Sequence, residues 1–185
     1  MLLGVSKTLE QYLLDTSPEL PANWLELVNY QSDDMTSATA GKVTLFLYAI
    51  AENRHLHNQP LERLPDGRFR QAPLALTLSY LIAYNAPDAV KGQQHLAVIL
   101  RAFHSKARLG PADLDASIQD KVEGLTVRLR AMSTEELNQV WTALNVGMRP
   151  ALFYDVDVAV IEPLPTAAIT QPVRRKETEY AQVTG

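Results

Sequence analysis

The sequence predicts an α/β (α+β) fold in which a mixed, largely antiparallel sheet packs against about three helices. Apolar residues recur with the helical period in some segments and alternate with the strand period in others. Asp66-Gly67 is a turn signal between two strand-like segments, as in an antiparallel hairpin. Residues 125–130 alternate apolar and polar side chains, which is typical of antiparallel sheets with one solvated face.

Three segments are expected to be amphipathic helices. The first starts at the amino terminus, the second covers residues 89–106, and the third follows Ser133 and Glu136, which have the spacing of a capping box. Gly147 stands where the end of the third helix favours a positive φ. The apolar stripes are Leu2, Val5, Leu9, Tyr12 and Leu13, then Val90, Leu96, Ile99, Leu100 and Phe103, and last Leu137, Val140, Trp141 and Leu144.

The strands are expected between these helices. Residues 24–30 form a short extended run, and residues 43–51 are apolar on both alternating sets, which predicts a central strand covered on both faces. Residues 74–84 place large apolar side chains on one face and small ones on the other, and residues 152–160 also alternate. The half-polar run 125–130 is expected near an edge or an open face of the sheet.

The chain is expected to form one domain over residues 1–162, with an appended arm or tail over residues 163–185. This tail contains few large apolar groups and three prolines, so it offers little to a core. Residues 31–41 are small and polar and predict a loop. Residues 52–70 are expected to form a hairpin arm that protrudes from the body.

Composition excludes several classes of function. The net charge of −4, without a long basic block, argues against a nucleic-acid partner. The absence of cysteine excludes disulfides, thiolate metal sites and cysteine nucleophiles, and suits folding in a bacterial cytoplasm. No run approaches the roughly 20 apolar residues that cross a bilayer, so no membrane partner is expected.

Motifs that carry chemistry are scarce. His55 and His57 share a strand face and could be half of a zinc or nickel site, but polar side chains on an exposed arm are the preferred interpretation. Asp155 and Asp157 could act as paired carboxylates or hold a hard cation, but a solvated strand face is the preferred interpretation. No nucleophile elbow, dinucleotide fingerprint or phosphate-binding loop is present. We therefore expect no enzyme activity and assign no catalytic, cofactor or metal residue.

The remaining singled-out residues are aromatic or basic. Periodicity predicts that most of the larger aromatic residues belong to the core. The basic triplet in the tail either docks on an acidic partner surface or solubilises the tail, and both interpretations stay open. The aromatic set is Tyr12, Trp24, Tyr84 and Trp141, and the triplet is Arg174, Arg175 and Lys176.

Four sequence runs together resemble a known family. They are KVTLFLYAIAENRHLHNQ, PLALTLSYLIAY, QHLAVILRAFHSKARL and LNQVWTALNVGMRPALFYDVDV. In order and spacing they are similar to the cap, or tail-terminator, proteins of contractile injection systems such as antifeeding-prophage and virulence-cassette particles. The resemblance covers about residues 1–165, and residues 108–124 match least.

This resemblance implies a structural subunit similar to phage tail terminators. Such a subunit forms a closed ring, expected to be a hexamer, on the distal end of tube and sheath and ends their polymerisation. The implied partners are further copies of the chain and the tube and sheath proteins, and the implied location is a particle assembled in the bacterial cytoplasm. Asn53, Arg54 and Arg149 stand at family-like positions and join the basic triplet as interface candidates, while Pro150 fixes the start of the last strand.

Two alternatives stay open. One is a small α/β enzyme or ligand-binding protein without a recognisable motif, which should be a monomer with a deep pocket. The other is a tail-assembly chaperone, which should be absent from the finished particle.

Overall fold

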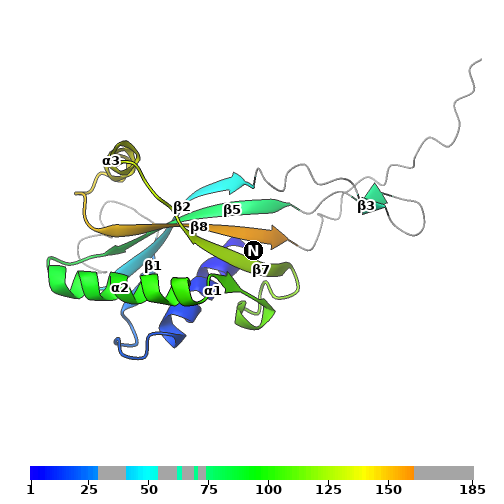
Figure 1. The fold of residues 1–185 in the computed structure, drawn as a ribbon, viewed down its shortest axis with the longest axis horizontal. Helices are drawn as coiled ribbons and strands as arrows, with labels where there is room; N and C mark the ends of the chain where they lie inside the picture. The colour runs from blue at the N-terminus through cyan, green and yellow to red at the C-terminus, as the bar shows by residue number, and fades with distance from the viewer. Residues whose placement is uncertain (29–40, 54–61, 64–68, 71–73, 161–185) are drawn as a thin grey trace, which may run out of the picture.

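The computed structural model describes residues 1–28, 41–53, 62–63, 69–70 and 74–160. Within these ranges the chain forms a six-stranded sheet in the order β1-β2-β5-β8-β7-β6 and a separate β3–β4 ribbon (Figure 1). The helices are α1 (Leu2–Asp15), α2 (Ala89–Ser105), α3 (Thr134–Ala143) and the short 3-10 helix η1 (Pro111–Asp113). The strands are β1 (Leu25–Leu27), β2 (Val43–Glu52), β3 (Glu62–Arg63), β4 (Phe69–Arg70), β5 (Ala75–Tyr84), β6 (Arg108–Leu109), β7 (Val122–Leu129) and β8 (Ala151–Val160).

Strand pairing confirms the predicted fold class. β1 runs parallel to β2, and every other pair in the sheet is antiparallel. The last strand, β8, lies between β5 and β7, so strands far apart in the sequence form the middle of the sheet. This mixed, largely antiparallel sheet with three α-helices is the predicted α+β arrangement.

Helices α1 and α2 cover one face of the sheet (Figure 1). The predicted stripe of α1 is confirmed, because Val5, Leu9 and Leu13 are buried in the main core. The large side chains of β5 alternate toward the same face, as predicted for residues 74–84. Together they bury Leu76, Leu78, Tyr80, Ile82, Leu96, Ile99, Phe103, Tyr154, Val156 and Val158.

The opposite face has a smaller cover. There α3 lies across one end of the sheet (Figure 1), and Trp141 packs with Leu81, Ala83 and Phe153 in a second cluster. Because α3 is short, it leaves the rest of this face without a helix among the described residues. Polar side chains occupy that remaining part, and they form the candidate site described below.

The capping box of α3 is confirmed, but the expected role of Gly147 is wrong. Ser133 accepts from the backbone of Glu136, and α3 ends at Ala143. The left-handed residue is Asn145, with φ of 53°, and asparagine tolerates that conformation better than most residues. The helix ends before Gly147 because the backbone N–H groups of Asn145 and Val146 donate to carbonyl oxygens in its last turn.

Two other expectations are corrected. β2 is the second strand from an edge and is buried only over its first three residues, so it is not a central strand covered on both faces. Only the short β1 flanks its outer side, and no described helix reaches its far end. In α2, Val90 is 67% exposed and Leu100 is 37% exposed, because Gly92, His95, Leu96 and Ile99 form the buried stripe and Val90 lies on the other side of the helix.

The segment between α2 and β7 supplies core residues that the sequence pattern did not reveal. Leu114 and Ile118 are both buried in the main cluster. The four-residue spacing of these two apolar residues was the only sequence signal for their burial. They lie in an irregular segment with a single turn of 3-10 helix, where periodicity has little predictive value.

β3 and β4 pair antiparallel, with Glu62 opposite Arg70, which agrees with the predicted hairpin. The turn Asp66-Gly67 itself, most of the loop predicted over residues 31–41 and the whole tail over residues 163–185 lie outside the described residues. Among the described residues, none of the helices has the length and apolarity that crossing a membrane requires.

Gly124 is expected to tolerate no side chain. A Cβ atom there would lie 2.8 Å from the backbone oxygen of Leu109, in the adjacent strand β6. Gly124→Ala should therefore lower the free energy of unfolding by about 1–3 kcal/mol, since backbone must move to make room. Thermal or urea unfolding measures this loss. Gly110→Ala is the control, because nothing lies within 4 Å of its added Cβ; equal stability of the two variants would contradict the prediction.

Candidate assembly surface

The half of the sheet that α3 leaves uncovered carries a ladder of polar side chains. Ser79 on β5 donates from its hydroxyl to the Asp155 carboxylate on β8 at 2.7 Å, and Thr77 donates to Asp157 at the same distance. Each pair stands at directly opposed positions of the two strands. We call this set, completed by Arg128 and Arg130, the polar ladder.

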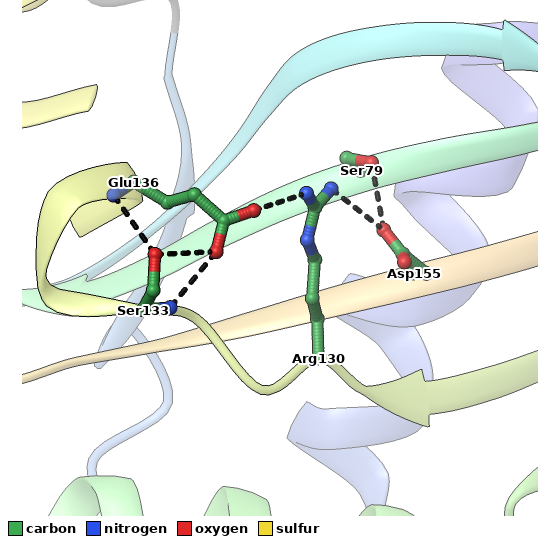
Figure 2. Close-up of polar contacts among 5 residues, drawn as sticks. All are labelled: Ser79, Arg130, Ser133, Glu136 and Asp155. Atoms are coloured by element: carbon green, nitrogen blue, oxygen red, sulfur yellow. Dashed lines mark hydrogen bonds and ion pairs between the residues drawn. The ribbon is translucent and has the colours of Figure 1, made fainter. Parts of the chain in front are cut away.

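The two arginines extend the ladder across the neighbouring strand β7. Arg128 lies 2.8 Å from the Asp157 carboxylate, and Arg130, just after β7, lies 3.9 Å from that of Asp155. Arg130 also reaches Glu136 on α3 at 3.1 Å (Figure 2). One guanidinium therefore connects the middle of the sheet to the first turn of the helix that covers its other end.

The first turn of α3 is fixed by reciprocal hydrogen bonds. Glu136 accepts from the backbone N–H of Ser133 at 2.8 Å, and the Ser133 hydroxyl accepts from the Glu136 N–H at 3.2 Å (Figure 2). The bond from the Ser133 backbone, that from its hydroxyl and the one from Arg130 lower the pKa of the Glu136 carboxyl. This carboxylate is ionised at neutral pH and also complements the positive end of the helix dipole.

The ladder holds strands in register and does not assemble a reactive group. Asp155 and Asp157 bind hydroxyls and guanidinium groups from neighbouring strands, which agrees with a solvated strand face. The described part of the chain contains no group of three or more histidine, aspartate or glutamate residues placed to hold a metal ion. Charged side chains that already have partners within the subunit give this surface a fixed shape and charge pattern.

Arg149 is held within the subunit just before β8. Its guanidinium donates to the Asn85 side-chain oxygen at 2.6 Å and lies 5.9 Å from the centre of the Trp141 ring. These contacts connect the segment before β8 to the end of β5 and to α3. Pro150 directly precedes β8, as expected for a residue that fixes the start of the strand.

Of the other interface candidates, the structure describes only Asn53. Asn53 is buried, and its backbone N–H donates to Ala75 at 2.9 Å, which continues the β2–β5 pairing past the end of β2. Arg54, Arg174, Arg175 and Lys176 lie outside the described residues, as do His55 and His57.

The two described histidines both belong to α2. His95 is buried, its Nδ1 lies 2.7 Å from the Lys91 carbonyl oxygen, and its ring stacks on Tyr84. His104 is exposed near the end of the helix. The aromatic residues expected in the core are there: Trp24, Tyr84 and Trp141 are buried, and Tyr12 packs against the main cluster.

Residues 4–175 match the protein family described as the Pvc16 N-terminal domain. The chain belongs to this family. No curated protein matches it. The family match covers the whole six-stranded sheet, α2, α3 and all of α1 except its first two residues.

Two solved structures share the fold of this Pvc16 N-terminal domain. One is described as the PVC sheath/tube terminator, in extended state, of an extracellular contractile injection system; it has a TM-score of 0.62 and 20% identity, and the match covers 100% of this chain and 64% of that one. The other is described as the anti-feeding prophage cap, a tube-terminating cap, with a TM-score of 0.61, 21% identity and coverage of 97% and 62%. The chain thus spans less than two thirds of the length of either relative.

Removing the capping hydroxyl of α3 should destabilise the domain. Ser133→Ala loses the acceptor for the Glu136 N–H, and such losses typically cost about 1 kcal/mol. Urea unfolding, followed by circular dichroism, measures the change. Ser133→Thr keeps a hydroxyl that can accept from the Glu136 N–H and donate to the Glu136 carboxylate, so it should stay close to the wild type. A Ser133→Ala protein as stable as the Ser133→Thr protein would contradict this role.

The lowered pKa of Glu136 predicts a pH dependence of the same cap. Because the folded carboxyl has the lower pKa, its stabilisation is complete above the ordinary value of 4.5 and is lost as the pH falls through the lowered value. Glu136→Gln should therefore lower Tm at pH 7. At pH 3 the difference in Tm between the variant and the wild type should be smaller. The side chain is exposed, so the effect should be small. A gap that stays constant with pH would refute the assignment.

Asp155→Ala tests the polar ladder. The substitution leaves the Ser79 hydroxyl without its acceptor and removes one carboxylate near Arg130, so we expect a loss of about 1–2 kcal/mol. Denaturant unfolding measures it, and Ser79→Ala combined with Asp155→Ala should cost less than the sum of the single substitutions. Strict additivity would show that the two groups do not interact.

Proposed function

We propose that this protein is a structural cap subunit of a contractile injection system, which ends the growth of its tube and sheath. The family match over residues 4–175 is the observation that carries the proposal. It is supported by a fold shared along 97–100% of this chain with two proteins described as terminators. We infer a non-enzymatic role, in which the subunit acts through its shape and its contacts with other proteins.

The architecture suits a subunit that must keep one shape. The main core under α1 and α2 and the smaller cluster under α3 fix both faces of the sheet. The polar ladder ties three neighbouring strands together, because each carboxylate of β8 binds a side chain on either side of it. Stacking of rings can end only if the terminating ring presents the same surface from every copy, and a rigid subunit provides this.

The proposed assembly is a closed ring of identical copies, with a hexamer as the expected form. It would sit on the distal end of the tube and sheath of a particle assembled in the bacterial cytoplasm. In the proposed ring, Arg54 and the basic triplet Arg174, Arg175 and Lys176 contact neighbouring subunits or the sheath. Arg149 and Asn53 shape the surface from within, since both have partners inside the subunit.

Deleting the gene tests the proposed function in a strain that produces the particles. We expect tubes and sheaths of irregular length, seen by electron microscopy, and recovery of a uniform length when the gene is restored. Particles of normal length without the protein would contradict the proposal. Mass spectrometry of purified wild-type particles is the companion measurement, since a protein absent from them would be an assembly chaperone.

The two arms have a separate prediction. If residues 52–70 or 163–185 contact the sheath or a neighbouring subunit, deleting either range should reduce the fraction of capped particles. The measurement is the length distribution of particles rescued by each deletion variant. The control is a variant with Gly147→Ala, because nothing lies within 4 Å of the added Cβ. Normal capping by both deletion variants would reject the role of the arms.

A further inference from the structure

The outer side of β7 carries an apolar groove that none of the described residues fills. It has a volume of about 540 Å³ and lies between α2 and β7, with Ala97, Leu100, Phe103, Val127, Leu129 and Tyr154 among its lining residues. Leu129 is 56% exposed and Leu100 is 37% exposed. Large apolar side chains exposed side by side are typical of a surface that another protein covers.

Tyr154 lines this groove from β8. The residue is only 4% exposed. Burial raises the pKa of Tyr154 to about 12, so the hydroxyl is protonated at neutral pH and can donate.

The backbone beside the groove is also open. The N–H of Val127 donates outward to Ala107, whereas that of Arg130 donates inward to Phe153 on β8. Backbone groups alternate sides along a strand, so the N–H and C=O of Leu129 point outward, where no strand lies among the described residues. An extended segment could pair there and place a side chain in the groove.

The opposite edge of the sheet has a complementary surface. β1 pairs only with Val43–Leu45 of β2, so residues 47–51 have no strand on their outer side among the described residues. Ile50 is 51% exposed within this stretch. It stands opposite Leu78, just as Leu129 stands opposite Tyr154, so both exposed side chains lie on the sheet face that α1 and α2 cover.

The charges of the two edges are of opposite sign. Arg101 lines the groove and also lies 3.5 Å from the Glu19 carboxylate, and Arg108 is exposed on the neighbouring edge strand. On the other edge, Glu52 follows Ile50 by two residues and faces the same side, and it contributes its negative charge in addition to its contacts within the chain. An approach of one edge to the other therefore brings unlike charges together.

We propose that the α2–β7 groove receives the outer edge of β2 from a second copy of this chain, with Ile50 entering beside Leu129 and Tyr154. The two surfaces lie on opposite edges of one sheet, so the contact is head-to-tail and repeats from copy to copy until it closes. This contact would be the interface between neighbouring subunits of the proposed ring, so the inference rests on the proposed function.

Cysteine crosslinking tests the contact directly in the full-length protein, because the chain contains no native cysteine. Ile50→Cys and Leu129→Cys are made in separate proteins, mixed and oxidised. A disulfide needs Cα atoms within about 7 Å, so a linked heterodimer should form in good yield. The control pairs Ile50→Cys with Val90→Cys on α2, because Val90 is 67% exposed and so at least as accessible as Leu129 at 56%. Equal linkage of both pairs, or none at all, would overturn the proposed contact.

A second variant separates this contact from the proposed function. Leu129→Glu should abolish self-association measured by light scattering, while Val90→Glu, at another exposed apolar site, should not. If the wild-type protein forms rings and caps particles, but the cysteine pair does not link and Leu129→Glu still assembles, the contact is wrong and the function stands. If the wild-type protein stays a monomer and never joins particles, both are wrong.

Discussion

The antiparallel pairing of β5 with β8 is the constraint on which the rest of the structure depends. Its register sets Leu78 opposite Val156 and Ser79 opposite Asp155. A slip of one residue would turn the carboxylates of β8 into the main core and expose its valines. The hydroxyl-to-carboxylate hydrogen bonds between the two strands form only in the observed register. The polar face and the apolar face of the sheet therefore favour the same register.

The helices cover the two faces of this sheet unequally, and this leaves a polar area of one face exposed. α1 and α2 bury one face, while α3 buries only one end of the other. Charged side chains can occupy the remaining area because each has a partner on a neighbouring strand, which lowers the cost of holding it near the sheet. Arg130 then joins both regions through Glu136 and Asp155.

The edges of the sheet are left as the places where another protein can bind. Among the described residues, β1 pairs with only the start of β2, and β6 pairs with only part of β7. The family match over residues 4–175 and the fold shared with two solved structures extend over this whole sheet.

The sequence by itself determined the local elements and the family. The stripe of α1, the capping box at Ser133 and the alternation of β5 depend on residues close in the chain, so their spacing was enough to predict them. Only the tertiary structure decided which elements meet. The insertion of β8 between β5 and β7, the contact of Arg149 with Asn85 and the exposed end of β2 join or separate residues far apart in the sequence. No periodic pattern encodes these neighbours, because they result from the packing of whole elements around one core.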